Sequence, residues 1–179
     1  MGSKILLYKG RRGCGKTLTM VKDGFRYYKS GRKVYSNLKS VKFAEFISEE
    51  DILNLNKDSN VSNCVILMDE LQIFFDSRRS QKKQNLNFSN FIQQVRKRNI
   101  IILGTTQYSN TIDLRLRQHV DIIAYPNFNK DHNVCPVMYV DLTAIEDDIL
   151  GQIKEPEVVN IVYDPLPVFN LFDTEEMLR

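Results

Sequence analysis

The segment that most constrains this chain runs from Gly10 to Thr17 and reads Gly-Arg-Arg-Gly-Cys-Gly-Lys-Thr. It follows an apolar run at 5–8 and precedes an amphipathic stretch at 16–29. Glycines let the backbone turn tightly, so that its N–H groups point inward at phosphate oxygens. Lys16 adds a charge for the β- and γ-phosphates, Thr17 adds a hydroxyl for Mg²⁺, and a following helix adds its positive end. We therefore expect a nucleoside triphosphate to bind Gly10, Arg12, Gly13, Cys14, Gly15, Lys16 and Thr17.

Two further apolar runs end in polar side chains that suit phosphate chemistry. The run 64–68 is followed by Asp69 and Glu70, and the run 100–103 is followed by a segment that ends at Gln107. An apolar strand ending in Asp delivers a carboxylate to the edge of the sheet where Mg²⁺ is held. Glu70 can orient or deprotonate an attacking water, and Gln107 can sense the γ-phosphate. Taken alone, each segment is better explained as an ordinary surface loop at the end of a strand. Beside the glycine-rich loop, Asp69 and Glu70 predict hydrolysis.

The order of apolar runs and breakers predicts the fold class. Strand-like runs separated by helical stretches are typical of an α/β protein with a mostly parallel central sheet flanked by helices. Ser48 and Asp51 form a capping box that divides one helical stretch into two pieces. The expected strands are 5–8, 34–36, 65–68, 100–103 and 120–124, and the expected helices are 16–29, 43–55 and 89–97.

The pattern changes after Pro126, where 138–142 and 158–163 indicate additional edge strands or a hairpin. A length of 179 residues suits one domain with a full core. We expect a single domain over 1–179, with its core at about 4–125 and a C-terminal extension at about 126–179.

Composition limits the cellular setting. No apolar run approaches the roughly 20 residues of a membrane-spanning helix, and the amino terminus lacks the pattern of a signal peptide. Cys14, Cys64 and Cys135 are odd in number and widely spaced, which favours neither a disulfide framework nor a zinc site. These features predict a cytoplasmic protein without a membrane segment.

The net charge of +3 conceals a strongly uneven distribution. Residues 1–42 hold twelve Lys and Arg against one acid, or +11, and residues 71–98 hold seven against one, or +6. Residues 119–179 hold three bases and twelve acids, or −9. Basic residues without opposing acids are typical of phosphate binding, although a solvated surface loop has the same composition. The candidates for DNA contact are Arg78, Arg79, Lys82 and Lys83.

Together these motifs resemble the motor domains of the FtsK/HerA superfamily of RecA-like P-loop NTPases. The run Asp113-Leu-Arg115-Leu-Arg117 extends the likeness. The resemblance is closer still to the zonula-occludens-toxin-like and viral genome-packaging ATPases of that superfamily, which carry an Asn soon after the second strand, as at Asn37. They also carry an aromatic-Asp-Thr near the end, as at 172–174. The resemblance covers about 4–125, with a weaker likeness in the tail.

This resemblance implies a strand order of 5-1-4-3-2, ATP with Mg²⁺ as the bound nucleotide, and a ring that is a hexamer or a pentamer. It implies ATP-driven translocation of double-stranded DNA, with Thr17 and Asp69 at the metal and Glu70 and Gln107 at the water. Arg115 or Arg117 would reach the nucleotide of a neighbouring subunit. Toxin-like members usually carry a membrane segment after the motor. Its absence here favours a viral packaging motor in the host cytoplasm, with a capsid or portal protein as a further partner.

Two other functions stay open. Type II thymidine kinases share a phosphate loop and a strand followed by Asp-Glu-x-Gln-Phe-Phe, which residues 69–75 approach. Those kinases use a four-cysteine zinc lasso, which three scattered cysteines cannot build. The remaining alternative is an assembly or secretion ATPase that never touches nucleic acid. An ATPase assay with and without double-stranded DNA separates the three.

Overall fold

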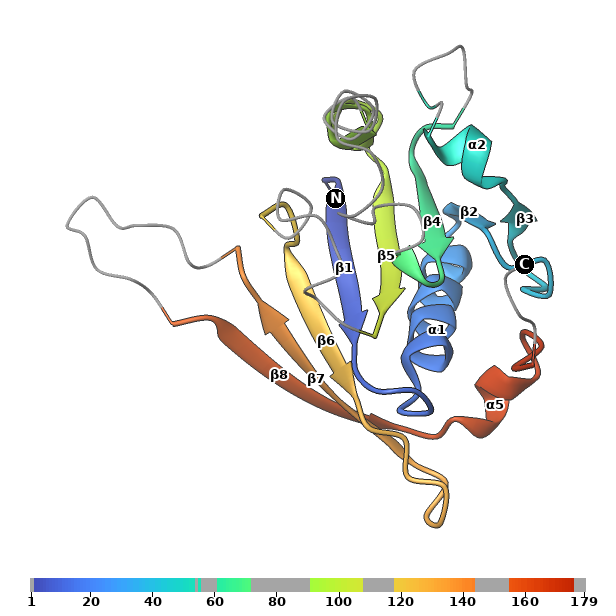
Figure 1. Ribbon diagram of the computed structural model, residues 1–179, viewed down its shortest axis with the longest axis vertical. Coiled ribbons are helices and arrows are strands. Elements are labelled where there is room, and N and C mark those ends of the chain that lie inside the picture. Colours follow the sequence, from blue (N-terminus) through green and yellow to red (C-terminus); the bar gives the residue numbers. More distant parts are fainter. Residues whose placement is uncertain are drawn as a thin grey trace.

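A computed structural model describes residues 2–53, 55, 61–71, 91–107, 118–143 and 155–175. In this part of the chain the strands form one eight-stranded sheet in the order β3-β2-β4-β5-β1-β6-β7-β8 (Figure 1). The strands are β1 Lys4–Lys9, β2 Lys33–Ser36, β3 Glu45–Phe46, β4 Cys64–Met68, β5 Ile101–Thr106, β6 Ile122–Pro126, β7 Cys135–Asp141 and β8 Glu157–Tyr163. The helices are α1 Lys16–Lys29, α2 Glu49–Leu53 and α5 Leu166–Phe169, and residues 91–97 are also helical.

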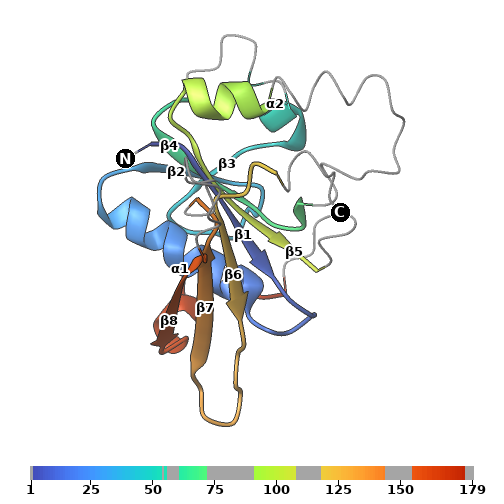
Figure 2. The same ribbon diagram turned by 90° about the vertical axis from the view of Figure 1, so that its left-hand side faces the viewer.

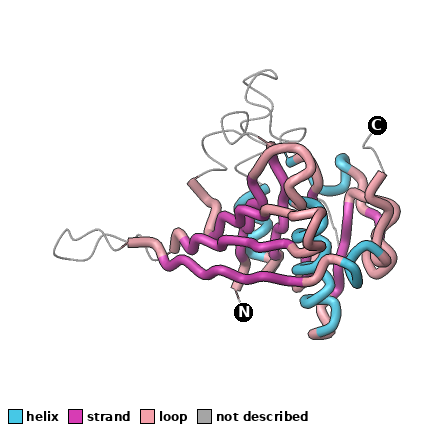
Figure 3. Tube along the Cα trace, turned by 90° about the horizontal axis from the view of Figure 1, so that it is seen from below, coloured by secondary structure: helices cyan, strands magenta, loops and turns pink. Residues whose placement is uncertain are grey.

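The parallel centre of the sheet confirms the predicted fold. The five expected strands correspond to β1, β2, β4, β5 and β6, and their spatial order β6-β1-β5-β4-β2 is the predicted 5-1-4-3-2. β1 pairs in parallel with β5 and with β6, so that Leu6 lies between Leu103 and Ile122. β7 and β8 add two antiparallel strands, as expected for the C-terminal extension. Figure 3 shows the strands side by side from below.

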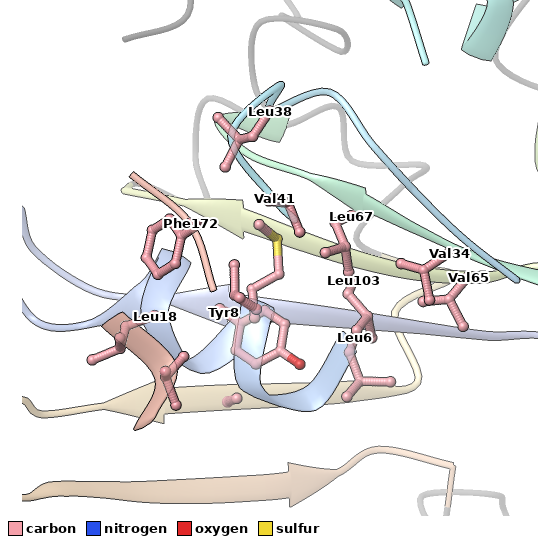
Figure 4. Close-up of a cluster of buried hydrophobic side chains, with 14 of the residues drawn as sticks. Leu6, Tyr8, Leu18, Val34, Leu38, Val41, Val65, Leu67, Leu103 and Phe172 are labelled. Carbon is pink, nitrogen blue, oxygen red and sulfur yellow. The ribbon is translucent and has the colours of Figure 1, made fainter. Parts of the chain in front are cut away.

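Helices cover both faces of this sheet (Figure 2). Successive residues of β1 face opposite sides, so Leu6 and Tyr8 join the core under α1 while Ile5 and Leu7 join the core under the helix 91–97. β4 is buried along its whole length, which explains why its sequence is a continuous apolar run. Figure 4 shows the first of these cores, which contains Tyr8, Leu18, Leu67, Leu103 and Phe172.

The helix predicted at 16–29 has the predicted bounds, and the helix predicted at 89–97 is described from residue 91. Gly31 at φ 84° and Asn99 at φ 53° adopt the left-handed conformation just beyond these two helices. The prediction of helix throughout 43–55 is wrong at its start, where β3 lies instead. Ile47 N–H donates to the Ser36 carbonyl at 2.9 Å, so backbone pairing with β2 replaces the first helical piece.

A buried carboxylate joins α1 to two strands. Asp23 of α1 accepts hydrogen bonds from the hydroxyls of Tyr8 on β1 and Tyr139 on β7, both at 2.8 Å to Oδ2. Its other oxygen accepts from Lys22 Nζ at 3.0 Å. The same acid therefore fixes the helix to the parallel sheet and to the antiparallel extension. Within the described ranges, no helix is both long and apolar enough to span a bilayer.

Candidate nucleotide site

The glycine-rich loop connects the end of β1 to the start of α1 with the backbone that the motif requires. Gly13 and Gly15 have φ of 80° and 91°, in the left-handed region. A Cβ at Gly15 would lie 3.1 Å from Phe128 Cβ and 3.2 Å from Cys135 Sγ, so a side chain there is disfavoured both by conformation and by space. Lys16 begins α1 and is 7% exposed, with Nζ donating to the Arg11 carbonyl at 3.0 Å. Its ammonium thus lies back over the loop, where phosphates would sit.

Asp69 lies at the end of β4 and is the centre of the polar network. The hydroxyls of Thr17, from α1, and Thr105, from β5, donate to the same oxygen of Asp69, Oδ1, at 2.8 and 2.7 Å. Burial raises the pKa of the Asp69 carboxyl, and the hydrogen bonds from Thr105 and Thr17 oppose that rise. The loop and two strands therefore converge on one carboxylate.

The residue that follows β2 holds the backbone of Asp69 as a clamp. The Asn37 side chain accepts from the Asp69 N–H at 2.8 Å and donates to the Asp69 carbonyl at 3.0 Å. Asn37 is only 6% exposed, and its own N–H donates to the Leu67 carbonyl at 3.2 Å. The asparagine that follows the second strand thus positions the acid that follows β4.

Glu70 is oriented by two partners, one on β5 and one just after it. Its backbone adopts φ 53°, which is uncommon for a residue with a side chain, and its N–H donates to Thr105 Oγ1 at 2.9 Å. Gln107 Nε2 donates to Glu70 Oε1 at 3.2 Å. The carboxylate and the amide therefore face each other beside Asp69, where both could contact a water near the γ-phosphate.

The loop and the polar side chains that follow β4 and β5 line an open cavity of about 1120 Å³. One end holds the loop with Lys16 and Thr17, together with Asp69, Glu70 and Gln107. The cavity also reaches a different part of the chain, formed by Phe128, Lys130, Phe169 and 172–175. Its volume is large enough for a nucleotide, since small-molecule sites commonly measure about 300–1,000 Å³.

The site suits a hard divalent cation. Thr17 and Asp69 place a hydroxyl oxygen and a carboxylate oxygen 2.8 Å apart beside the loop. Oxygen donors of this kind are what Mg²⁺ takes, usually with one or two carboxylates, waters and the phosphates of the substrate. The two residues predicted to hold Mg²⁺ therefore lie together and have suitable chemistry.

The structure brings together the predicted residues of the loop with Asp69, Glu70 and Gln107, while six predicted basic residues lie outside the described residues. Those six are Arg78, Arg79, Lys82, Lys83, Arg115 and Arg117. Sequence reasoning did not include Thr105 or Asn37 among the site residues. A signal for Thr105 was present, because it lies two residues before Gln107 and so on the same side of a strand.

Comparison with solved structures supports the fold. The N-terminal domain of zonular occludens toxin from Neisseria meningitidis matches with a TM-score of 0.67 at 19% identity, covering 97% of this chain and 100% of that chain. The genome packaging NTPase B204 from Sulfolobus turreted icosahedral virus 2, in complex with ATP-gammaS, matches with a TM-score of 0.56 at 11% identity, over 87% and 97% of the two chains. The flagellar accessory protein FlaH from Methanocaldococcus jannaschii matches with a TM-score of 0.54 at 10% identity, over 88% and 84%.

The expected likeness to toxin-like and packaging ATPases is therefore confirmed at the level of the fold. No curated protein matches the sequence significantly. A family model described as "ATPase family associated with various cellular activities (AAA)" matches residues 5–127. That match spans more than half of the chain, and it agrees with a phosphate loop whose threonine is bonded to the acid at the end of β4. The chain belongs to the AAA family of ATPases.

Proposed function

We propose that this protein is an ATP-driven translocase that packages double-stranded DNA into a viral particle. The observation that carries the proposal is the hydrogen-bonded series from Thr17 through Asp69 and Thr105 to Glu70 and Gln107. It connects the phosphate loop to both strands that would respond to hydrolysis. The likeness to the viral genome packaging NTPase B204, which is also described as a DNA-packaging ATPase, supports DNA as the substrate that is moved.

Binding of ATP is assigned to the loop. Its backbone N–H groups and Lys16 would hold the β- and γ-phosphates. The turn that presents these N–H groups would be formed by Gly10, Arg12, Gly13, Cys14 and Gly15. Thr17 and Asp69 would hold Mg²⁺, which neutralises negative charge on the phosphate oxygens when it is bound. Thr105 and Asn37 keep Asp69 in place for this role.

Hydrolysis is assigned to Glu70 and Gln107. Glu70 would accept a proton from the attacking water, because its carboxylate lies at the same end of the cavity as Lys16 and Thr17. Gln107 donates to that carboxylate at 3.2 Å and would exchange this bond for one to the water or the γ-phosphate. A change at Gln107 would then pass along β5, which is how hydrolysis could be communicated to the rest of the motor.

Coupling to DNA is assigned to residues chosen from sequence. The ring, a hexamer or a pentamer, would place Arg115 or Arg117 against the nucleotide of the neighbouring subunit, where such an arginine stabilises the transition state. A basic loop after β4 would touch DNA phosphates in a central pore. Its contacts would come from Arg78, Arg79, Lys82 and Lys83.

We further propose that 1–179 forms one domain, which the single sheet from β1 to β8 supports. We propose that it is active in the cytoplasm of the host, with a capsid or portal protein as its partner.

The decisive test is ATP hydrolysis with and without double-stranded DNA. The wild type should hydrolyse ATP faster with DNA, and Lys16→Ala should hydrolyse none in either condition. The variant with alanine at Arg78, Arg79, Lys82 and Lys83 should keep basal hydrolysis but lose stimulation by DNA. The slope of log K for DNA binding against log salt concentration should become smaller by roughly 0.9 for each phosphate contact removed.

A matched control removes the same charge elsewhere. Lys29, Lys33, Lys39 and Lys42 are all exposed, and their replacement by alanine should leave the slope unchanged. An unchanged slope in the loop variant with a reduced slope in this control would move the DNA path to the first 42 residues. A wild type whose ATPase ignores DNA would refute translocation altogether.

The likeness to FlaH favours one other function, an assembly ATPase that does not use nucleic acid. That function predicts hydrolysis without DNA stimulation and without salt-dependent DNA binding. A nucleoside kinase would instead transfer the γ-phosphate to a nucleoside. The same reactions, repeated with a nucleoside added and analysed for nucleoside monophosphate, distinguish all three.

A further inference from the structure

We infer that the cavity also contains the site for the purine base of the nucleotide, built by residues from the C-terminal half of the chain. The aromatic rings of Phe128 and Phe169 would form its wall, with Phe172 behind them. This inference rests on the proposed binding of a nucleoside triphosphate at the loop. It adds the part of the ligand that the loop does not recognise.

Sheet order determines the direction in which the nucleotide lies. β1, which carries the loop, lies between β5 on one side and β6 on the other, and β4 lies beyond β5. Asp69 and Glu70 follow β4, and Gln107 follows β5, so the γ-phosphate belongs on that side of the loop. The nucleoside therefore leaves over the opposite side, toward the chain that follows β6.

Phe128 lies on that opposite side and is attached directly to the loop. It follows β6, its N–H donates to the Cys14 carbonyl at 3.0 Å, and its Cβ lies 3.1 Å from the position that a Cβ at Gly15 would take. The base end and the phosphate end of the site are therefore connected by a backbone hydrogen bond. Substitution of Gly15 would disturb both ends at once.

The aromatic wall is completed by the chain beyond β8. The rings of Phe128 and Phe169 are 5.9 Å apart at 67°, an edge-to-face pair, and both side chains are half-buried. In an edge-to-face pair the edge of one ring covers one face of the other, so the pair itself leaves the remaining faces uncovered. A purine can therefore stack on the open face of this pair, within the same cavity as Lys16 and Thr17.

The segment that carries Phe169 is anchored in the core. Figure 1 places α5 near the loop end of α1, and Val168 and Phe172 on either side of Phe169 are 6% exposed. The Leu171 carbonyl accepts a hydrogen bond from the Lys42 N–H at 2.9 Å. Figure 4 shows Phe172 in the same cluster as Leu18 of α1. The wall is thus held at a fixed distance from the loop without any ligand.

Exposed polar residues follow the wall and line the cavity. Asp173 and Glu175 offer carboxylate oxygens, and Asp173 Oδ1 already accepts the Glu175 N–H at 2.9 Å in a local turn. Carboxylates accept from ribose hydroxyls and from exocyclic amino groups. Because stacking uses the face of a ring and not its hydrogen-bonding edge, this site should favour purines over pyrimidines more than adenine over guanine.

The test compares ATP with inorganic tripolyphosphate, which has the phosphates but no base. Calorimetric titrations with Mg²⁺ would use the wild type and Phe169→Ala. Phe169→Ala should bind ATP at least about tenfold more weakly, since stacking of one base on one aromatic ring has this magnitude. Its affinity for tripolyphosphate should be unchanged, which also shows that the variant is folded. Phe169→Trp should restore ATP binding.

Leu166→Ala is the matched control, because Leu166 lies on the same helix, is 56% exposed and does not line the cavity. It should bind both ligands as the wild type does. Equal weakening of ATP and tripolyphosphate by Phe169→Ala, or ATP binding unaffected by that change, would overturn the base site while leaving nucleotide binding intact. A wild type that binds neither ligand would overturn the proposed function itself.

Discussion

Thr105 contacts both of the acids that follow β4, so its substitution is the most direct test of how the site is held. Its hydroxyl donates to Asp69 Oδ1 at 2.7 Å and accepts the Glu70 N–H at 2.9 Å, and the residue is completely buried. Thr105→Val keeps the shape of the side chain and removes both hydrogen bonds. The change therefore tests whether β5 fixes the two acids that follow β4.

The expected loss of stability follows from the two bonds. A hydrogen bond to a charged group contributes about 1.5–3 kcal/mol, and a buried N–H left without a partner costs about 1–3 kcal/mol. Asp69 keeps the bond from Thr17 and the clamp from Asn37, which limits the loss. We expect the free energy of unfolding to fall by about 3 kcal/mol, which lowers Tm by roughly 6–12 °C in a domain of this size.

The expected loss of activity is separate from the loss of stability. Glu70 without its backbone restraint no longer holds its carboxylate toward the water, and a displacement of about 1 Å can cost about a hundredfold in rate. We expect kcat to fall by about tenfold to a hundredfold. The affinity for ATP should change little, because the phosphate loop is intact.

Thermal unfolding and steady-state ATPase activity would be measured for the wild type, Thr105→Val and Thr105→Ser, to test whether the Thr105 hydroxyl positions Glu70. Thr105→Ser keeps the hydroxyl and loses only a methyl group, so it should lie close to the wild type in kcat and lose about 1 kcal/mol of stability. If Thr105→Val turns over ATP like the wild type, the hydroxyl does not position Glu70. If Thr105→Ser is as slow as Thr105→Val, the methyl group and not the hydrogen bonds carries the effect.

Three other changes follow from the same structure. Glu70→Gln should bind ATP normally and hydrolyse it at least about a hundredfold more slowly, measured by equilibrium binding and single-turnover hydrolysis; collapsed affinity with normal turnover of bound ATP would reverse the roles of the two acids. Asp23→Ala removes the acceptor of two tyrosine hydroxyls, that of the buried Tyr8 and that of the half-buried Tyr139, so urea unfolding should show a loss of about 2–5 kcal/mol, whereas the exposed Asp131→Ala should show almost none. Arg115→Ala or Arg117→Ala should lose about 10³ in hydrolysis rate but not ATP binding, and mixing with Lys16→Ala subunits should restore part of the activity; full activity of both arginine variants as dilute monomers would exclude a ring.

The sequence predicted the central strands well because β1, β4 and β5 are buried on both faces. Runs such as 64–68 are apolar throughout, which only a central strand requires, and the helix 16–29 has a clear amphipathic pattern with a glycine beyond its end. The spatial order of the strands came from the resemblance and not from periodicity. β3 was not predicted, because its two residues are exposed and are held in the sheet by backbone pairing to β2.

The candidate site was predicted where chemistry depends on local sequence. The loop, Asp69, Glu70 and Gln107 each follow a recognisable strand, so their positions could be deduced from spacing alone. Asn37 and Thr105 act by contacts across the sheet, between residues 32 and 36 positions apart. Short polar side chains near strand ends are common, and only the pairing of β2, β4 and β5 shows which of them meet.

The network around Asp69 also explains how the site can be formed before the nucleotide arrives. A hydroxyl has one proton and two lone pairs, so Thr17 can donate to Asp69 and still present oxygen to a cation. Asp69 has a second carboxylate oxygen besides the one that accepts from both threonines, and the Asn37 clamp holds its backbone whichever oxygen is used. Binding therefore needs no rearrangement of β4, and the entropic cost of ordering these side chains has been met during folding.

Glu70 and Gln107 differ from this network, because they face each other and must separate to contact a water. The half of the site that would bind Mg²⁺ is thus held by hydrogen bonds from three elements, whereas the half that would sense the γ-phosphate has to exchange its own hydrogen bond.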